Sequence, residues 1–292
     1  MILLGVAALA GGVFYFAPED ESYDGGEPGN SNSSQGAGTP GQSAGAPRSL
    51  FRDTLKDGSE GPEMIVIPAG QFEMGCVSGK ECSKDELPVH AVTFDKPFAI
   101  GKYEVTFVDY DRFAEATGAR EPDDRGWGRG SRPVIYVSWD DATEYAKWVS
   151  QQTGKRYRLP SDAEWEYATR AGTRTRWSFG NDETDLGTYA WYGGNSGGKT
   201  HPAGEKNANP WGMHDVHGNV WEWVQDCWHD SYEGAPDRRS AWGKEGGGNC
   251  GRRVVRGGSW FTTPGNLRSA TRSRDTADYR DGNIGFRLAQ DL

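Results

Sequence analysis

The segment from residue 211 to 223 constrains the fold of this chain more than any other stretch. Its thirteen residues, WGMHDVHGNVWEW, include three tryptophans, two glycines, two histidines and two carboxylates. Ordinary helices and strands do not combine bulky aromatic side chains with conformationally permissive glycine at this density. The segment therefore predicts a tight, irregular backbone with a specific role.

The composition extends this prediction to the whole chain. Twelve Trp, twelve Tyr and eleven Phe supply large side chains for a core, and forty-two Gly predict many turns. The 292 residues are enough for one domain of about 230 residues and a tail. We therefore expect a loop-rich fold rather than a helical bundle.

The charge excludes one class of partner. The formal net charge is −10, and residues 1–61 carry eight acids against three bases. The remainder of the chain is thus also acidic, at about −5. This balance argues against non-specific binding of nucleic acid.

The first 61 residues divide into two segments. Residues 2–17 form an apolar run of sixteen, about 24 Å long as a helix and short of a bilayer core of about 30 Å. We expect residues 1–17 to be a signal peptide, a membrane anchor, or the end of a span that begins upstream. Residues 18–61, acidic and then rich in Gly, Ser and Pro, predict a flexible tether. Each alternative predicts a periplasmic or extracytoplasmic location, with anchoring in the inner membrane if the segment is uncleaved.

The ordered domain is predicted to span residues 62–292, beginning with a β-rich run. Helices are predicted after Thr106, Ser138 and Ser161, ending at glycines 118, 154 and 172. Ser161 and Glu164 form a capping-box pattern. No further helix is predicted beyond Gly172, where short apolar pieces alternate with turn residues.

The four cysteines are even in number in a chain that is predicted to be exported. Three pairings are possible, and the local one, Cys76 with Cys82 and Cys227 with Cys250, is the most economical. A zinc site is the alternative, but no Cys-x-x-Cys pair or complementary histidine spacing supports it.

The segment 211–223 contains candidate metal ligands. Asp215 and Glu222 flank the Gly218-Asn219 turn, and carboxylates with nearby main-chain carbonyls suit calcium. The alternative is a turn whose tryptophans fill a core. His214 and His217 are a weaker candidate for a transition metal, because no third ligand lies nearby in sequence.

Several motifs occur in an order that resembles a known family. They are Met64–Gly75, Lys102–Thr106, Pro133–Trp139, Tyr157–Ala168, Gly218–Trp223, Arg256–Trp260 and Asn283–Leu288. Together they resemble the formylglycine-generating enzyme, or sulfatase-modifying factor, domain over residues 62–292. The resemblance implies an α+β fold, a single loop-rich domain related to C-type lectins, with little regular secondary structure.

The resemblance also implies a calcium site. It corresponds to the side chains of Asp215 and Glu222 and the carbonyls of Gly218 and Val220, with Asp215 in place of the usual Asn. A second family calcium site is not expected, because Trp191 stands where an Asn follows the Tyr-Ala pair.

The catalytic centre of the family is altered in this sequence. Active members oxidise a sulfatase cysteine to formylglycine with oxygen, copper and two cysteines. Here Thr262 occupies the first cysteine position, and the second falls on Leu267 or within a short deletion. Thiolates suit Cu(I) and these side chains do not, so the catalytic pair is lacking and copper is not expected. Trp221, Ser259 and Thr262 match residues of the family's groove, although a turn and a core role explain them as well.

Arginines are frequent near the C-terminus. Either they present cations to an acidic partner or, as we expect, several pair with Asp275, Asp278 and Asp281. The arginines are Arg268, Arg272, Arg274, Arg280 and Arg287.

The leading hypothesis is an exported or membrane-tethered, non-catalytic protein that acts as a binding or regulatory module in the cell envelope, as in secretion or kinase signalling. Its partner is expected to be an envelope protein or a ligand, with the membrane contacted through the N-terminal segment. The alternative is an oxidoreductase of the same fold, similar to the pyoverdine-maturation protein or to a sulfatase-modifying enzyme with an atypical site. A diversified ligand-binding protein is disfavoured, because residues 259–283 contain only two Asn.

Overall fold

A computed structural model describes residues 49–292. The expectations for residues 1–17 and for the tether up to residue 48 lie outside the described residues. Within 49–292, no helix is long and apolar enough to cross a membrane.

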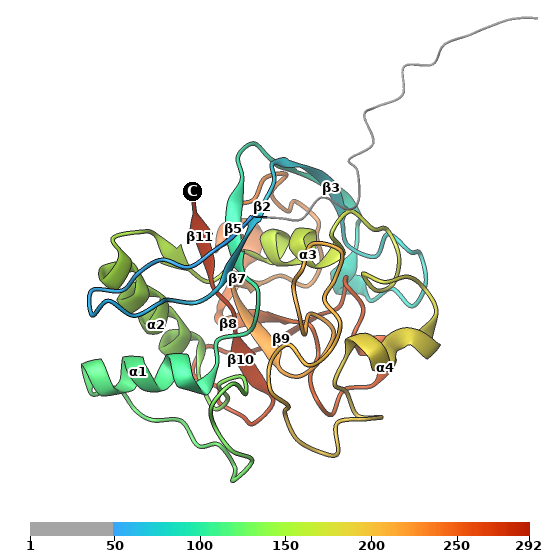
Figure 1. Cartoon of the computed structure of the whole chain (residues 1–292). Helices are drawn as coiled ribbons and strands as arrows, with labels where there is room; N and C mark the ends of the chain where they lie inside the picture. The colour runs from blue at the N-terminus through green and yellow to red at the C-terminus, as the bar shows by residue number, and fades with distance from the viewer. Residues whose placement is uncertain (1–48) are drawn as a thin grey trace, which may run out of the picture. The chain divides into compact units, whose positions relative to one another are not determined.

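Three small sheets form the framework (Figure 1). An antiparallel sheet has the order β1 (Leu50–Phe51), β2 (Met64–Ile67), β5 (Phe98–Gly101), β11 (Ala289–Asp291), β6 (Tyr157–Arg158). A second has the order β10 (Ile284–Phe286), β7 (Trp221–Trp228), β8 (Asn249–Arg256), β9 (Arg272–Thr276), with β10 and β7 parallel. Strands β3 (Gly70–Met74) and β4 (His90–Phe94) form a hairpin. Long ordered loops connect these short strands, as predicted.

Three helices begin at the predicted caps. They are α1 (Phe107–Thr117), α2 (Trp139–Thr153) and α3 (Asp162–Arg170), and each starts with a complete capping box. Helix α3 ends at Ala171 in the left-handed conformation, one residue before the predicted Gly172. The prediction that no helix follows Gly172 is wrong, because the one-turn helix α4 (Leu186–Tyr189) lies beyond it. Short 3-10 turns occur at Lys84–Glu86, Glu183–Asp185, Glu245–Gly247 and Pro264–Asn266.

The N-terminal boundary of the domain lies earlier than predicted. Strand β1 pairs with β2, and Leu55 is buried in the core. Asp53 accepts hydrogen bonds from the Tyr157 hydroxyl at 2.8 Å and the Gln290 amide at 2.5 Å. Residues 49–61 are therefore part of the fold and not of a tether. The sequence analysis assigned these residues to the tether because they contain few apolar side chains. One buried leucine and the hydrogen bonds of Asp53 are what hold the segment on the domain.

Two aromatic cores support the sheets. One joins α1 and α2, which lie at the left of the strands in Figure 1, through Phe113 and Tyr145, whose ring centroids are 5.6 Å apart. The other packs α3 against β4 and β5, where Tyr167 stacks on Phe94 at 4.3 Å. Neighbouring residues of β5 belong to different clusters: Ala99 lies in the cluster of α1 and α2, and Phe98 and Ile100 lie in the cluster of α3. The two cores therefore share this strand.

The cysteines form the predicted disulfides. Cys76 pairs with Cys82 and Cys227 with Cys250, with Cα atoms 5.5 and 4.4 Å apart. The second bridge links β7 to β8 at the end of the sheet away from the Arg256 side. In the chain-entropy account its closed loop contributes about 3 kcal/mol.

A buried ionic cluster fixes α3 to the second sheet. The fully buried Arg256 guanidinium at the end of β8 bonds Asp162 and, at 2.6 Å, Glu166 of α3. Arg272 of β9 binds the same Asp162 at 3.0 Å. Because a buried charge without a partner is costly, each member of this cluster requires the others.

The C-terminal arginines pair with acids that are distant in sequence. Among residues 49–292, none of the five forms an ion pair with Asp275, Asp278 or Asp281, so that prediction is wrong. The observed pairs are Arg268 with Glu86, Arg272 with Asp162, Arg280 with Asp141 and Arg287 with Glu222, while Arg274 lies over the Trp228 ring. Tertiary packing, which brings buried acids to these arginines, decides the partners.

Asp226 is a buried carboxyl beside this cluster. Its oxygens accept the backbone N–H groups of Asp162 at 2.8 Å and Trp242 at 2.7 Å. Burial, and then the charge of Asp162, raise the pKa of Asp226 to about 7. The folded protein thus binds a proton here more tightly than the unfolded chain does.

We predict that Asp226 makes stability pH-dependent between about pH 4 and 7. A raised carboxyl pKa contributes stability that is present at low pH and is lost as pH rises through the folded pKa. Asp226→Asn should remove this pH dependence, which is at most about 4 kcal/mol across the window because one pKa unit corresponds to about 1.4 kcal/mol. Urea unfolding of both proteins at several pH values measures it, and parallel profiles would contradict the assignment.

Candidate functional site

The turn after β8 carries Ser259 and Thr262, two of the residues that the resemblance predicted to lie in a groove. Gly257 and Gly258 have φ values of +92° and +77°, which only glycine adopts without strain. A Cβ on Gly258 would also lie 2.3 Å from the Leu267 side chain. These glycines allow the chain to leave the sheet and place Ser259 against the loop at 262–267.

Ser259 and Thr262 bond to each other. The Thr262 hydroxyl oxygen accepts the Ser259 N–H at 2.9 Å and lies 3.0 Å from the Ser259 hydroxyl, while the Thr262 N–H donates to the Ser259 carbonyl at 3.0 Å. Both side chains are buried. The pair therefore closes a turn, and neither hydroxyl is presented to solvent as a reactive group.

Leu267 is one of the two predicted locations of the second cysteine position, the other being a short deletion. It is fully buried and packs with Trp177, Leu186 and Ala190 in a third apolar cluster. A bonded threonine hydroxyl and a buried leucine offer no soft ligand. The residues at this position do not fit a copper ion.

A partly exposed aromatic surface lies beside the turn and was not predicted. We call Trp127, Trp260 and Phe261 the aromatic face. The Trp260 ring contacts Trp127 edge-on at 5.3 Å and Phe261 at 5.1 Å, and its Nε1–H donates to the Gly282 carbonyl at 2.9 Å. Phe261 is 52% exposed. The sequence signal for this surface is the pair Trp260-Phe261 shortly after the glycine turn. Residue type alone does not distinguish such surface aromatics from aromatics of the core.

The segment that carries Trp221 is hydrogen-bonded to this turn. The Trp260 N–H donates to the Asn219 carbonyl at 2.9 Å, and the Trp221 N–H donates to the Asn283 carbonyl at 2.8 Å. The Trp221 ring is partly buried and packs against the first core. It therefore has a core role and retains an exposed part.

The predicted calcium residues lie at the start of β7. Asp215 and Glu222 are both buried, and Asp215 has a φ of +60° that turns the chain. Both oxygens of Glu222 bond Arg287, each at 2.6 Å, and Oε2 also accepts the Trp165 indole N–H at 2.8 Å. A guanidinium that the sequence did not assign to this site thus already neutralises Glu222.

Asp215 is the more available ligand. Its Oδ2 accepts the Gly204 N–H at 2.7 Å, and its buried Oδ1 has no hydrogen-bond partner within residues 49–292. Burial raises the pKa of Asp215 to about 6. A buried carboxylate oxygen without a partner favours a bound cation at Asp215 Oδ1, whereas Arg287 already bonds both oxygens of Glu222.

Glu104 is a third buried carboxylate at this site, which we name with Asp215 and Glu222 the carboxylate cluster. Its oxygens accept the Asn219 amide at 2.8 Å and the Val220 N–H at 3.3 Å. Burial, and then the charges of Asp215 and Glu222, raise the pKa of Glu104 well above its usual value. Glu104 belongs to the recognised motif Lys102–Thr106, but the sequence analysis gave it no role. It lies more than a hundred residues before Asp215 in the sequence, so its place in this site was not evident.

The histidines are not brought together as metal ligands. The buried His217 donates from Nδ1 to the Leu267 carbonyl at 2.8 Å, and its Nε2 accepts the Ser178 N–H at 3.0 Å. Burial lowers the pKa of His217 to about 4, so the ring is neutral. Among the residues that the structure describes, no three His, Cys, Asp or Glu side chains could hold one metal ion.

Comparison with known proteins agrees with this architecture. Residues 51–292 match the sulfatase-modifying factor enzyme 1-like domain. The formylglycine-generating enzyme of Streptomyces coelicolor is 31% identical over 78% of this chain and 88% of its own. The serine/threonine-protein kinase pkn1 of Chlamydia pneumoniae is 31% identical over 79% of this chain, which covers 38% of the kinase.

A solved structure is similar over nearly the same region. PvdO from Pseudomonas aeruginosa superposes with a TM-score of 0.76 at 40% identity, over 85% of this chain and 99% of that one. The matches confirm the predicted family and its loop-rich α+β fold. The chain belongs to the sulfatase-modifying factor enzyme 1-like domain family.

Proposed function

We propose that this protein is an exported or membrane-tethered, non-catalytic member of the family that binds a protein or ligand in the cell envelope. The observation that carries the proposal is the closed Ser259–Thr262 turn with Leu267 packed in the core. Without thiolates there, the family's oxidation of a cysteine lacks its copper ligands. A binding role needs no such group.

The disulfides support the proposed location. Bridges of this kind persist in oxidising compartments such as the periplasm and the cell exterior, and all four cysteines of the chain are paired. The kinase relative supports an accessory role, because a region like this domain makes up only part of that protein.

The aromatic face is the proposed contact surface. Phe261 is exposed at a hydrogen-bonded turn, and the partly buried Trp260 beside it is held by its bond to the Gly282 carbonyl. Aromatic side chains with little conformational freedom are typical anchors of binding interfaces. Phe261 is also one of a few large apolar side chains exposed within residues 49–292.

We predict that Phe261→Ser weakens partner binding about tenfold or more, as loss of an interface anchor does. The folded state should be unaffected, because the Phe261 ring is half exposed. Retention of an envelope partner by the immobilised protein, followed by titration of that partner, measures the effect. Val108→Ser on α1, equally exposed at 53%, is the control and should bind normally; equal binding by the Phe261 variant would contradict the proposal.

An oxidoreductase of the same fold is the second candidate. The 40% identity with PvdO favours it, since that likeness exceeds the likeness to the formylglycine-generating enzymes. Its chemistry would have to rest on groups other than the Ser259–Thr262 turn.

We predict that the protein does not convert a Cys-x-Pro-x-Arg peptide to formylglycine when copper and oxygen are supplied. The reason is the missing thiolate pair at Thr262 and Leu267. Mass spectrometry of the peptide gives the result, with the Streptomyces coelicolor enzyme assayed in parallel as a positive control. Appearance of formylglycine would show that thiolate ligation is dispensable in this chain.

We further propose that a structural calcium ion binds to Asp215 and Glu222 together with the main-chain carbonyl oxygens of Gly218 and Val220, beside Glu104. Glu104, Asp215 and Glu222 carry three negative charges when ionised, against the single positive charge of Arg287. A divalent cation would balance the remaining two, and Asp215 Oδ1 is free to bind it. Carboxylate and carbonyl oxygens are the ligands that calcium prefers.

We predict that EDTA lowers the melting temperature and that calcium restores it by about 5 °C or more, as expected for saturating binding to the folded state. Asp215→Ala should abolish the calcium effect. Asp226→Asn, which alters a buried carboxyl outside the cluster, should retain it. A melting curve that is the same in EDTA and in calcium would remove the calcium proposal.

A further inference from the structure

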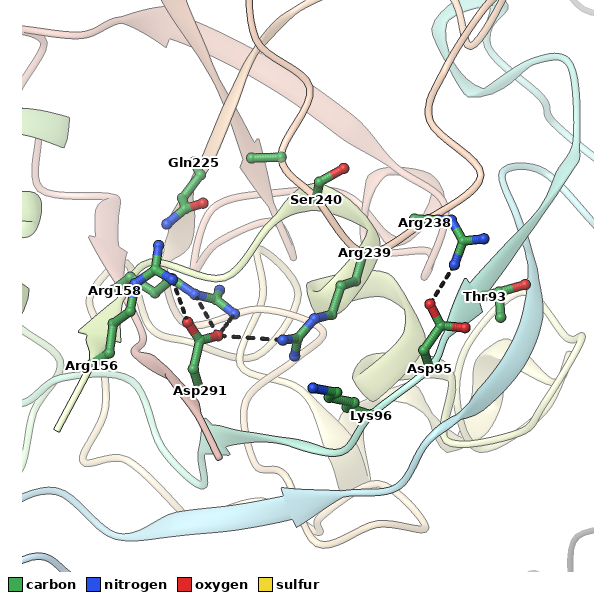
Figure 2. A pocket seen from close by; sticks show the side chains of 11 residues that line it. Thr93, Asp95, Lys96, Arg156, Arg158, Gln225, Arg238, Arg239, Ser240 and Asp291 are labelled. Carbon is green, nitrogen blue, oxygen red and sulfur yellow. Dashed lines mark hydrogen bonds and ion pairs between the residues drawn. The ribbon is translucent and has the colours of Figure 1, made fainter.

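A basic pocket lies at the ends of β6 and β11, and it shares no residue with the Ser259–Thr262 turn, the aromatic face or the carboxylate cluster. Its volume is about 540 Å³, within the range of small-ligand sites. Figure 2 shows it from close by. The lining residues are Thr93, Asp95, Lys96, Arg156, Arg158, Gln225, Arg238, Arg239, Ser240, Ala241 and Asp291.

The pocket has the opposite charge to the protein. Five of its lining side chains are Lys or Arg and two are Asp, whereas the whole chain has a formal charge of −10. A concave surface lined by one sign of charge concentrates ligands of the other sign. The pocket therefore favours an anion.

Asp291 shows that the arginines of this pocket can converge on the oxygens of one anionic group. Arg158 bonds its carboxylate at 2.6 Å, Arg156 at 3.0 Å, and Arg239 lies 3.7 Å away (Figure 2). These guanidinium groups lower the pKa of Asp291. One internal carboxylate is thus surrounded by three arginines, which together have more donors than its two oxygens can accept.

The walls of the pocket are fixed in place. Arg158 is held by the buried Glu164 through two bonds, at 2.6 and 2.7 Å. The loop of Arg238 and Arg239 is pinned where the Thr93 N–H donates to the Asp237 carbonyl at 2.8 Å and the Ser161 hydroxyl donates to the Arg239 carbonyl at 2.7 Å. The Arg158 side chain and the backbone of residues 237–239 are therefore fixed before a ligand binds, which lowers the entropic cost of binding.

Some donors in the pocket have no partner. Arg239 Nη1 is buried and has no hydrogen bond within the described residues, although Glu164 lies 3.8 Å away. The ammonium of Lys96 forms no ion pair within residues 49–292, and its side chain lines the same pocket (Figure 2). A buried N–H without a partner is costly, and an anion between these groups would satisfy it.

We propose that this pocket binds a tetrahedral oxyanion, the phosphate or sulfate group of a small molecule, with Lys96, Arg238 and Arg239 as its contacts. Guanidinium groups from several directions match the four oxygens of such a group better than the two of a carboxylate. Two carboxylates of the pocket compete with the ligand: Asp291 pairs with Arg156, Arg158 and Arg239, and Asp95 pairs with Arg238. This site is independent of the proposed function, so the failure of either leaves the other unaffected.

The test is titration of the intact protein with inorganic phosphate, inorganic sulfate and succinate, at constant low ionic strength and pH 7.5, by calorimetry. Phosphate and sulfate should bind saturably, and succinate about fivefold or more weakly. The relative affinities of phosphate and sulfate identify which ester the pocket prefers. No saturable binding of either, or equal binding of succinate, would overturn the proposal.

Variants separate this site from general surface charge. Lys96→Gln combined with Arg238→Gln should weaken binding about tenfold or more, with the melting temperature unchanged because Lys96 and Arg238 are exposed. Lys147→Gln combined with Arg174→Gln removes the same charge from exposed residues outside the pocket and should bind normally. Asp291→Asn should bind about fivefold more tightly. Equal loss in both double variants, or weaker binding by a folded Asp291 variant, would contradict the assignment.

Discussion

The bonding of Arg256 is the interaction on which the rest of the domain depends. The guanidinium is fully buried, and its donors bond Asp162, Glu166, the Tyr232 hydroxyl and the carbonyls of Ser269 and Thr271. These partners belong to α3, to the loop after β7 and to the approach to β9. Removing one side of such a pair leaves a buried charge, at a cost of about 3–5 kcal/mol. The cluster therefore specifies one arrangement of helix and sheet where regular secondary structure is sparse.

The same device recurs at the start of β7. Arg287 bonds Glu222 on both oxygens and also donates to the carbonyls of Gly101 and His214, at 3.0 Å each. It thus connects β5, the 211–223 segment and β10. In a loop-rich fold, main-chain carbonyls that no ladder satisfies are available to arginine, whose fixed fork of donors can reach several at once. Buried arginines such as Arg256 and Arg287 are thus stabilised by buried carboxylates and by main-chain carbonyls together.

Local signals were sufficient for part of this structure. The capping boxes at Thr106, Ser138 and Ser161 depend on neighbouring residues only, so the three long helices were predictable. The motif order gave the family and the fold, and economy of loop closure gave the disulfides. The partners of the arginines, the role of Glu104 and the pocket around Asp291 were not predictable, because each depends on residues from distant segments. The N-terminal boundary was missed for a similar reason, since Leu50–Phe51 forms a strand only beside β2.

The position of β11 has a consequence for how the domain is made. This strand lies between β5 and β6 in its sheet, yet residues 289–291 are synthesised long after both. The sheet cannot close until nearly the whole chain has left the ribosome, and contacts of such long sequence separation form slowly. During that interval the chain lacks the strand that joins its two halves. Such a delay leaves an unfolded chain available to any machinery that moves polypeptides before they fold.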